Sequence, residues 1–245
     1  MLTNIYNKHK SEVKIMKVTW ITQAGLLFDT GKIKIMVDPY LSDSVGKLEP
    51  KKARRIPVKE ELFDVSPDVI IITHDHLDHL DPETLSRFLS REEKEILVLA
   101  PENAYNKLLT FGGGHNYVLL APHSVFSFGG ITFYSVKAEH SDRCAAGFIL
   151  DDNNRTYYVS GDTLYNYDVI DDVLSLVEDG VDYAFLPING VGNNMNAKDA
   201  ADFAYEIGAK CAIPLHYGLF DSIDPKEFDF EDAMILAPYE RTELK

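Results

Sequence analysis

Residues 69–79 read Val69-Ile70-Ile71-Ile72-Thr73-His74-Asp75-His76-Leu77-Asp78-His79 and combine an apolar run with three histidines. The first four residues are apolar and β-branched, which is typical of a short buried strand. Side chains alternate along an extended chain, so His74 and His76 point to the same side where the chain leaves the sheet. Asp81-Pro82-Glu83 then supplies an N-cap residue, a proline at the first helical position and a first-turn acid, which together predict a helix over residues 83–90.

The turn between this strand and this helix can bring Asp78 and His79 toward His74 and His76. Partly buried imidazoles and carboxylates that crowd together repel one another or stay unsatisfied unless they hold a cation. The alternative is a solvated polar loop in which Asp-His pairs hydrogen-bond one another, and a single His-x-His favours that alternative. The fuller pattern His-x-His-x-Asp-His behind a buried strand instead predicts a metal site.

The chain resembles the metallo-β-lactamase superfamily in seven potential ligands that stand in the superfamily's order: His74, His76, Asp78, His79, His140, Asp162 and His216. Four flanking segments are similar to the L-ascorbate-6-phosphate lactonase-like branch: Ile21-Thr22-Gln23-Ala24-Gly25, Val37-Asp38-Pro39-Tyr40, Leu186-Pro187-Ile188-Asn189-Gly190 and Ile213-Pro214-Leu215-His216-Tyr217-Gly218. The resemblance extends from about Val18 to about Pro225. It implies a four-layer αββα sandwich whose metal loops gather along one edge between the sheets.

Hydrophobic periodicity by itself predicts a sheet-rich α+β chain, in which helices cover the outer faces of two packed sheets. Strands are expected over residues 17–22, 25–30, 32–38, 69–72, 95–100, 117–120, 124–128, 131–138, 146–150, 156–160, 183–188, 212–215 and 233–237, and further helices over residues 101–110, 167–177 and 197–207. The polar residues 43–55 are expected to form a loop. One domain is expected over residues 16–245, preceded by a frayed or disordered extension over residues 1–15.

Composition limits the classes of partner. The formal net charge of −15 argues against a nucleic-acid or anionic-membrane binder, because such partners are held by positive surface. No apolar run approaches the roughly 20 residues of a membrane span. Only two cysteines occur, which fits a cytoplasmic protein without a disulfide framework. We therefore expect a small-molecule substrate, and the family analogy adds a possible homo-oligomer.

Seven donors fit a pair of divalent ions better than one ion. The resemblance implies that His74, His76 and His140 hold the first ion, that Asp78, His79 and His216 hold the second, and that Asp162 bridges the two. We assign Asp78 and Asp162 to the catalytic machinery as well. A nitrogen and carboxylate set without thiolate suits manganese, zinc or iron, and the resemblance favours manganese, followed by zinc.

Two ions of this kind present hydroxide near pH 7 and polarise a scissile carbonyl or phosphoryl oxygen. We expect attack on a lactone or another small, phosphorylated ester. Two other functions stay open: a phosphodiesterase acting on nucleic acid or phospholipid, and a non-catalytic metal-binding protein that retains the fold.

Four amide side chains are candidates for substrate binding: Gln23, Asn189, Asn194 and Asn196. The basic cluster Lys51-Lys52-Ala53-Arg54-Arg55 is either a solvated loop, which we favour, or a site that captures an anionic group of the substrate.

Overall fold

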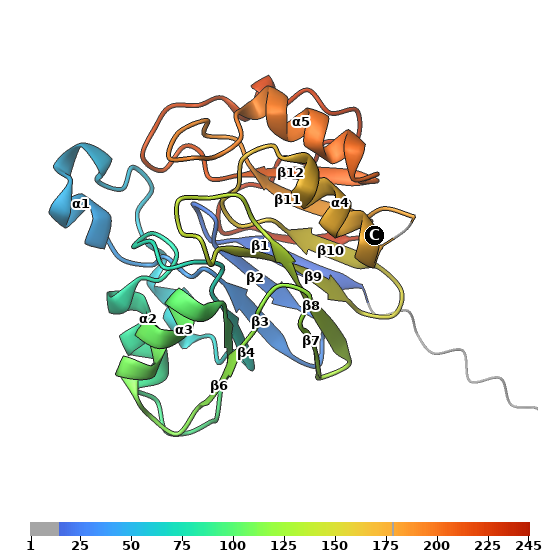
Figure 1. Ribbon diagram of the computed structural model, residues 1–245. Coiled ribbons are helices and arrows are strands. Elements are labelled where there is room, and N and C mark those ends of the chain that lie inside the picture. The colour runs from blue at the N-terminus through green and yellow to red at the C-terminus, as the bar shows by residue number, and fades with distance from the viewer. Residues whose placement is uncertain (1–14, 178) are drawn as a thin grey trace, which may run out of the picture.

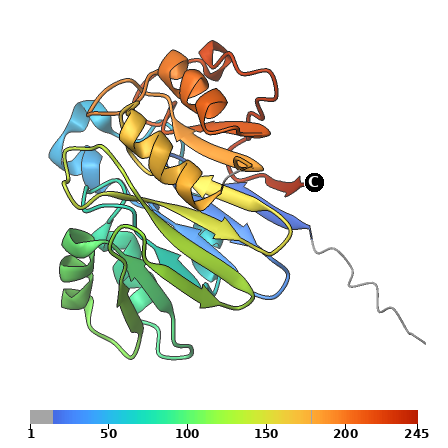
Figure 2. The same ribbon diagram turned by 45° about the vertical axis from the view of Figure 1, so that its right-hand side comes forward.

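The structure is a computed structural model that describes residues 15–177 and 179–245. Apart from Ile15, the predicted N-terminal extension over residues 1–15 lies outside the described residues. Two β-sheets pack face to face, and helices cover their outer faces (Figures 1 and 2). The predicted αββα sandwich is confirmed.

The first sheet has seven strands. Their order across the sheet is β13 (Arg241–Leu244), β1 (Met16–Trp20), β2 (Leu26–Asp29), β3 (Lys34–Val37), β4 (Val69–Ile71), β5 (Leu97–Ala100) and β6 (Asn116–Leu119). The strands from β13 to β3 pair antiparallel, as the predicted meander requires, whereas β3 to β6 pair parallel. Parallel pairing needs crossover connections, and helices on the outer face provide two of them.

The second sheet has six strands. Their order is β12 (Cys211–Leu215), β11 (Tyr183–Pro187), β10 (Thr156–Val159), β9 (Ala146–Asp151), β8 (Ile131–Lys137) and β7 (Val125–Phe128). The strands from β7 to β10 form an antiparallel meander, and β10 to β12 are parallel. Each sheet thus joins an antiparallel half to a parallel half.

The apolar run of residues 69–72, which precedes the histidine-rich turn of residues 73–79, is buried on both faces of the first sheet. Val69 and Ile71 belong to the core between the two sheets, whereas Ile70 and Ile72 pack under the outer helices of the first sheet. A strand that faces two apolar layers needs apolar residues at every position, which explains why this run does not alternate with polar residues.

Helices α2 (Pro82–Leu89) and α3 (Glu102–Leu108) cover the first sheet, and α4 (Tyr167–Leu176) and α5 (Ala197–Glu206) cover the second. The N-cap predicted at Asp81 is confirmed, since its carboxylate accepts hydrogen bonds from the backbone N–H groups of Glu83 and Thr84. No helix within residues 15–177 and 179–245 is long and apolar enough to cross a lipid bilayer.

Two sequence predictions were wrong. The predicted strand over residues 233–237 is absent, and Ala233 forms only an isolated bridge with Ala212. The strand of the C-terminal tail is β13 instead, where only Leu244 is buried, so an edge strand of this kind carries almost no apolar signal. Residues 43–55, predicted as a loop, contain helix α1 (Ser44–Leu48) and a 3₁₀ helix (Pro50–Lys52).

Candidate metal centre

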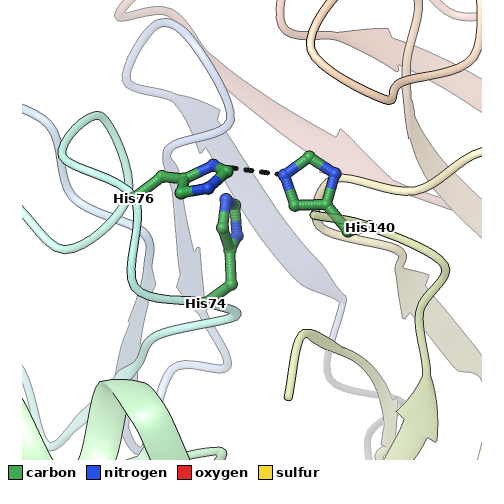
Figure 3. A group of neighbouring side chains, drawn as sticks. All are labelled: His74, His76 and His140. Carbon is green, nitrogen blue, oxygen red and sulfur yellow. Dashed lines mark hydrogen bonds between the residues drawn. The ribbon is translucent and has the colours of Figure 1, made fainter. Parts of the chain in front are cut away.

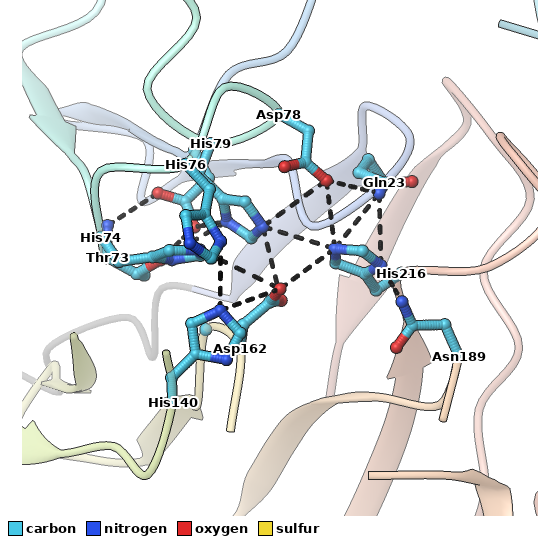
Figure 4. Close-up of polar contacts among 12 residues, drawn as sticks. Gln23, Thr73, His74, His76, Asp78, His79, His140, Asp162, Asn189 and His216 are labelled. Carbon is cyan, nitrogen blue, oxygen red and sulfur yellow. Dashed lines mark hydrogen bonds and ion pairs between the residues drawn. The ribbon is translucent and has the colours of Figure 1, made fainter. Parts of the chain in front are cut away.

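The seven predicted ligands lie at one edge of the sandwich, where strands of both sheets end. Four of them lie in the turn between β4 and α2, and the other three follow β8, β10 and β12. Figure 4 shows these side chains converging from both sheets. Because strands of two different sheets end at this edge, His79 and His216 become neighbours although 137 positions separate them.

His74, His76 and His140 form the first group. One nitrogen of each ring lies within 4.8 Å of a nitrogen of the others. His140 Nε2 and His76 Nδ1 are 3.2 Å apart. Figure 3 shows the three rings turned toward a common space. The arrangement matches the ligand set that the resemblance implies for the first ion.

Asp78, His79 and His216 form the second group. Nε2 of His216 lies 3.3 Å from Oδ2 of Asp78 and 3.4 Å from Nε2 of His79. Nε2 of His79 lies 3.9 Å from the same carboxylate oxygen. These three ligand atoms likewise surround one space.

Asp162 lies between the two groups. Its carboxylate oxygens are 3.4 Å and 3.3 Å from Nε2 of His79 and His216, and 4.0 Å and 3.9 Å from Nε2 of His74 and His140. The side chain is almost fully buried. A carboxylate in this position can contact an ion in either group.

Two buried polar atoms test whether the site fits a metal. Nε2 of His74 and Oδ1 of Asp162 have no hydrogen-bond partner within the described part of the chain. A buried polar atom left unsatisfied costs about 1–3 kcal/mol. Both atoms point into the space that the ligand groups share, and a divalent cation there would satisfy both. The imidazole and carboxylate donors fit such an ion.

Hydrogen bonds from Nδ1 leave Nε2 of three histidines free for a metal. Nδ1 of His79 donates to Asp38 Oδ2 over 2.7 Å, and Nδ1 of His140 donates to the carbonyl of Asn193 over 3.1 Å. The Thr73 hydroxyl donates to Asp38 Oδ2 and can therefore accept from Nδ1 of His74, 3.0 Å away. Outer partners of this kind select the tautomer in which Nε2 is a ligand.

The pKa values of the site's histidines are shifted in two directions: those of His74 and His140 are lowered, and those of His79 and His216 are raised. Burial lowers the pKa of His74 and His140, and neighbouring imidazoles lower it further. Burial also opposes a charge on His216, but Asp162 and Asp78 outweigh it and raise the His216 pKa to about 10. The His79 pKa is raised for the same reason, chiefly by Asp162 and Asp38. Protons on His79 and His216 can thus balance the carboxylates, and a cation can replace those protons.

The pKa values of Asp78 and Asp162 are lowered, in contrast to those of His79 and His216. Burial raises the pKa of Asp78 and Asp162, but the charges of His79 and His216 outweigh this effect and hold both pKa values well below the usual range. Both groups are therefore ionised at neutral pH, as metal ligation requires.

Of the four predicted substrate amides, Gln23, Asn189 and Asn194 line a cavity of about 770 Å³ above the centre. Gln23 Nε2 donates to Asp78 Oδ2 over 2.8 Å. An amide nitrogen of Asn189 lies 2.9 Å from Nδ1 of His216, and Asn189 Oδ1 has no partner in the described chain. Rotating this amide lets Oδ1 accept the Nδ1 proton, which leaves His216 Nε2 free for a metal.

Asn196, the fourth predicted substrate amide, makes a different set of contacts. Its side chain does not line the cavity but caps α5, accepting a hydrogen bond from the backbone N–H of Asp199 over 2.9 Å and donating one to the Asp199 carboxylate. Asparagine is a preferred N-cap residue, so its position just before a predicted helix was a signal for this role.

Sequence reasoning assigned no role to two buried carboxylates that support the ligand loops. Asp38, at the end of β3, is fully buried and accepts hydrogen bonds from His79 and Thr73. Asp142 accepts from the backbone N–H groups of Asp75 and Cys144, and so joins the histidine turn to the loop of His140. The available signal was Asp38 itself, an acid directly after an apolar strand that neighbours β4.

Comparison with known proteins identifies the family. A family model described as the beta-lactamase superfamily domain matches residues 34–217. A UPF0173 metal-dependent hydrolase of Exiguobacterium sp. is 28% identical over 238 residues, which cover 89% of this chain and 93% of the relative. Among solved structures, the metallo hydrolase Igni18 of Ignicoccus hospitalis superposes with a TM-score of 0.76 at 18% identity, covering 94% of this chain and 99% of the other.

YhfI of Bacillus subtilis, a metallo-β-lactamase fold protein, superposes with a TM-score of 0.70 at 21% identity, covering 94% of this chain and 99% of the other. The family model covers most of the chain, including all seven candidate ligands. The chain therefore belongs to the beta-lactamase superfamily, and its fold is the metallo-β-lactamase fold.

Proposed function

We propose that this chain, a metal-dependent hydrolase of the metallo-β-lactamase superfamily, opens a lactone or cleaves another small ester. The observation that carries the proposal is the pair of ligand groups joined by Asp162 at the base of an open cavity. Relatives named metal-dependent hydrolases, such as the one from Exiguobacterium sp., support hydrolysis. The four flanking segments that resemble the lactonase-like branch support a lactonase-like reaction. The resemblance favours a phosphorylated substrate.

In this proposal His74, His76 and His140 would hold one divalent ion, Asp78, His79 and His216 would hold a second, and Asp162 could serve either group. Manganese is the first candidate and zinc the second. Ions at these positions would lower the pKa of a shared water toward neutrality and draw electron density from the scissile carbonyl oxygen.

The protein's own groups orient the reactants. Asp78 and Asp162 both line the cavity and are ionised near pH 7, so their carboxylates can accept a hydrogen bond from an attacking water and align it. Asn194 is buried in the cavity wall and its Oδ1 has no partner in the described chain, so this amide can hydrogen-bond a substrate. The chain therefore supplies orientation and charge without a side-chain nucleophile.

Metal analysis followed by a substrate panel tests the proposal. We expect up to two equivalents of manganese or zinc per chain and turnover of simple lactones that stops when a chelator removes the metal. Turnover of bis-p-nitrophenyl phosphate without turnover of any lactone would favour the phosphodiesterase instead. Full metal loading without hydrolysis of any lactone, phosphodiester or β-lactam would favour a non-catalytic metal-binding protein.

A further inference from the structure

Two large apolar side chains in the outer wall of the active-site cavity are exposed to solvent. Leu48 on α1 is 76% exposed, more than any other large apolar side chain in the described part of the chain. Val191, in the loop after β11, is 66% exposed. Both line the same cavity as Asp162 and His216. Exposed apolar side chains beside a reaction centre are suited to bind an apolar ligand.

The wall that carries Leu48 is held in place by its own contacts. Val45, on the same helix, is buried in a small cluster with Tyr40 and Leu219, against which Leu77 and Phe220 pack. Lys47 on this helix forms an ion pair with Glu83 on α2, with 2.6 Å between Nζ and Oε1. Leu48 is therefore presented to the cavity by a packed segment.

Arg54 supports this segment and is not free to bind an anion. Its guanidinium donates to the carbonyls of Tyr40 and Ser42 over 2.8 and 3.1 Å and to the Thr22 hydroxyl over 2.9 Å. The remaining donors reach the Ile56 carbonyl and the Tyr239 hydroxyl. Of the basic cluster at residues 51–55, only Lys52 lines the cavity.

The charges around the cavity disfavour an anionic substituent. Nζ of Lys52 is paired with Glu49 Oε2 at 2.9 Å, and Glu49 lines the same wall. Asp221 also lines the cavity, and Arg55 donates to its backbone carbonyl. A phosphoryl group near this wall would meet two carboxylates and one lysine that is already paired. Within the described residues, the wall therefore complements an uncharged group.

We propose that the non-reacting part of the substrate is uncharged and apolar, and that it binds against Leu48 and Val191. The inference rests on the proposed function and specifies its substrate further. The non-reacting part of the substrate is an alkyl or aryl group rather than a phosphorylated one. Each methylene removed from water strengthens binding roughly fourfold, so three seated methylenes correspond to a gain on the order of 50-fold.

The first test compares two γ-lactones that differ only in tail length, γ-valerolactone and γ-nonalactone, on the metal-loaded protein. We expect kcat/KM to be higher for the longer lactone, on the order of 50-fold. The double variant Leu48→Ser, Val191→Ser should reduce this ratio to below about fivefold, because the apolar contacts are lost. Val125→Ser is the matched control, since Val125 is 58% exposed and does not line the cavity, and it should keep the wild-type ratio.

A second measurement separates this inference from the proposed function. Calorimetry with acetohydroxamate and octanohydroxamate measures the contribution of an alkyl tail without turnover. A tighter Kd for the longer hydroxamate, lost in the double variant, supports the apolar wall even if no lactone is hydrolysed and the proposed function fails. Equal affinities, no binding of either compound, or faster turnover of glucono-δ-lactone 6-phosphate than of glucono-δ-lactone would each overturn the inference.

Discussion

The carboxylate of Asp38 lies 2.7 Å from Nδ1 of His79, and both side chains are fully buried. The same carboxylate accepts two hydrogen bonds from Thr73, the residue before the first candidate ligand. Asp38 has a φ of 43°, a sparsely populated conformation for a residue other than glycine. Strain of this kind persists where the surrounding structure over-determines it, and here it aims a carboxylate at the metal turn.

Asp38→Asn should weaken metal binding. The amide keeps the size of the side chain, but it can no longer act as an anionic acceptor for both Nδ1 of His79 and the Thr73 hydroxyl. Loss of an outer partner of this kind typically costs about 10–100-fold in metal affinity. Competition with a chromophoric chelator measures the change. Asp64→Asn, at an exposed position outside the site, is the control, and an unchanged affinity in Asp38→Asn would contradict the role of this pair.

Asp162→Ala should lower both metal content and turnover. The carboxylate lies within 4.0 Å of four candidate histidine ligands, so its loss affects both groups together. We expect a loss of affinity larger than the roughly 10–100-fold typical of an outer partner, with a smaller effect on folding. Elemental analysis, steady-state kinetics and thermal unfolding measure the three quantities. Unchanged turnover at full metal loading would show that Asp162 has another role.

The stability of the chelator-treated protein should depend on pH in a defined way. The His216 pKa is raised to about 10 in the folded state, so its contribution to stability is fully present below about pH 6.5 and is lost as the pH rises through about 10. The Asp78 and Asp162 pKa values are lowered, so their contributions are present above about pH 4 and are lost as the pH falls further. The His74 and His140 pKa values are lowered by burial, so these rings cost stability as the pH falls below about 6.5. Stability should therefore be highest near pH 6.5.

Thermal unfolding between about pH 4 and 10, with and without metal, measures the effect. Between pH 7 and 10 the Tm of the chelator-treated protein should fall, whereas the metal-loaded protein should change less, because the ions replace the protons on His79 and His216. Parallel pH profiles for the two forms would contradict this exchange of protons for metal.

Asn194→Ala and Asn196→Ala should have different effects. Asn194 lines the cavity, so its substitution should raise KM for a lactone with little change in Tm. Asn196 caps α5, so its substitution should cost about 1 kcal/mol of stability and leave KM unchanged. Asn196→Gly is the control for capping, because glycine at an N-cap loses only a few tenths of a kcal/mol. A higher KM in Asn196→Ala would restore this residue to the substrate site.

The local chemistry of the chain was readable from the sequence. Val69–Ile72 is apolar at every position and therefore had to be a strand buried on both faces, and Asp81-Pro82 had to begin a helix. These features depend on residues within a few positions of one another, so propensity and capping rules apply to them directly. The four candidate ligands of residues 74–79 were predicted from local spacing, whereas His140, Asp162 and His216 were predicted from the family resemblance. The structure brings all seven together.

The details that depend on distant parts of the chain could not be predicted. Asp38 became a partner of His79 only because β3 and β4 pair in parallel, and the tail strand is β13 because its backbone pairs with β1 rather than because its side chains are apolar. Residues 43–55 read as a polar loop, yet they carry Leu48 into the wall of the cavity. The side chains that can bind a metal follow from the residue types, because ligand chemistry belongs to each residue. The acids that orient those ligands and the apolar residues that line the cavity depend on the fold, because these contacts form only after the two sheets have packed.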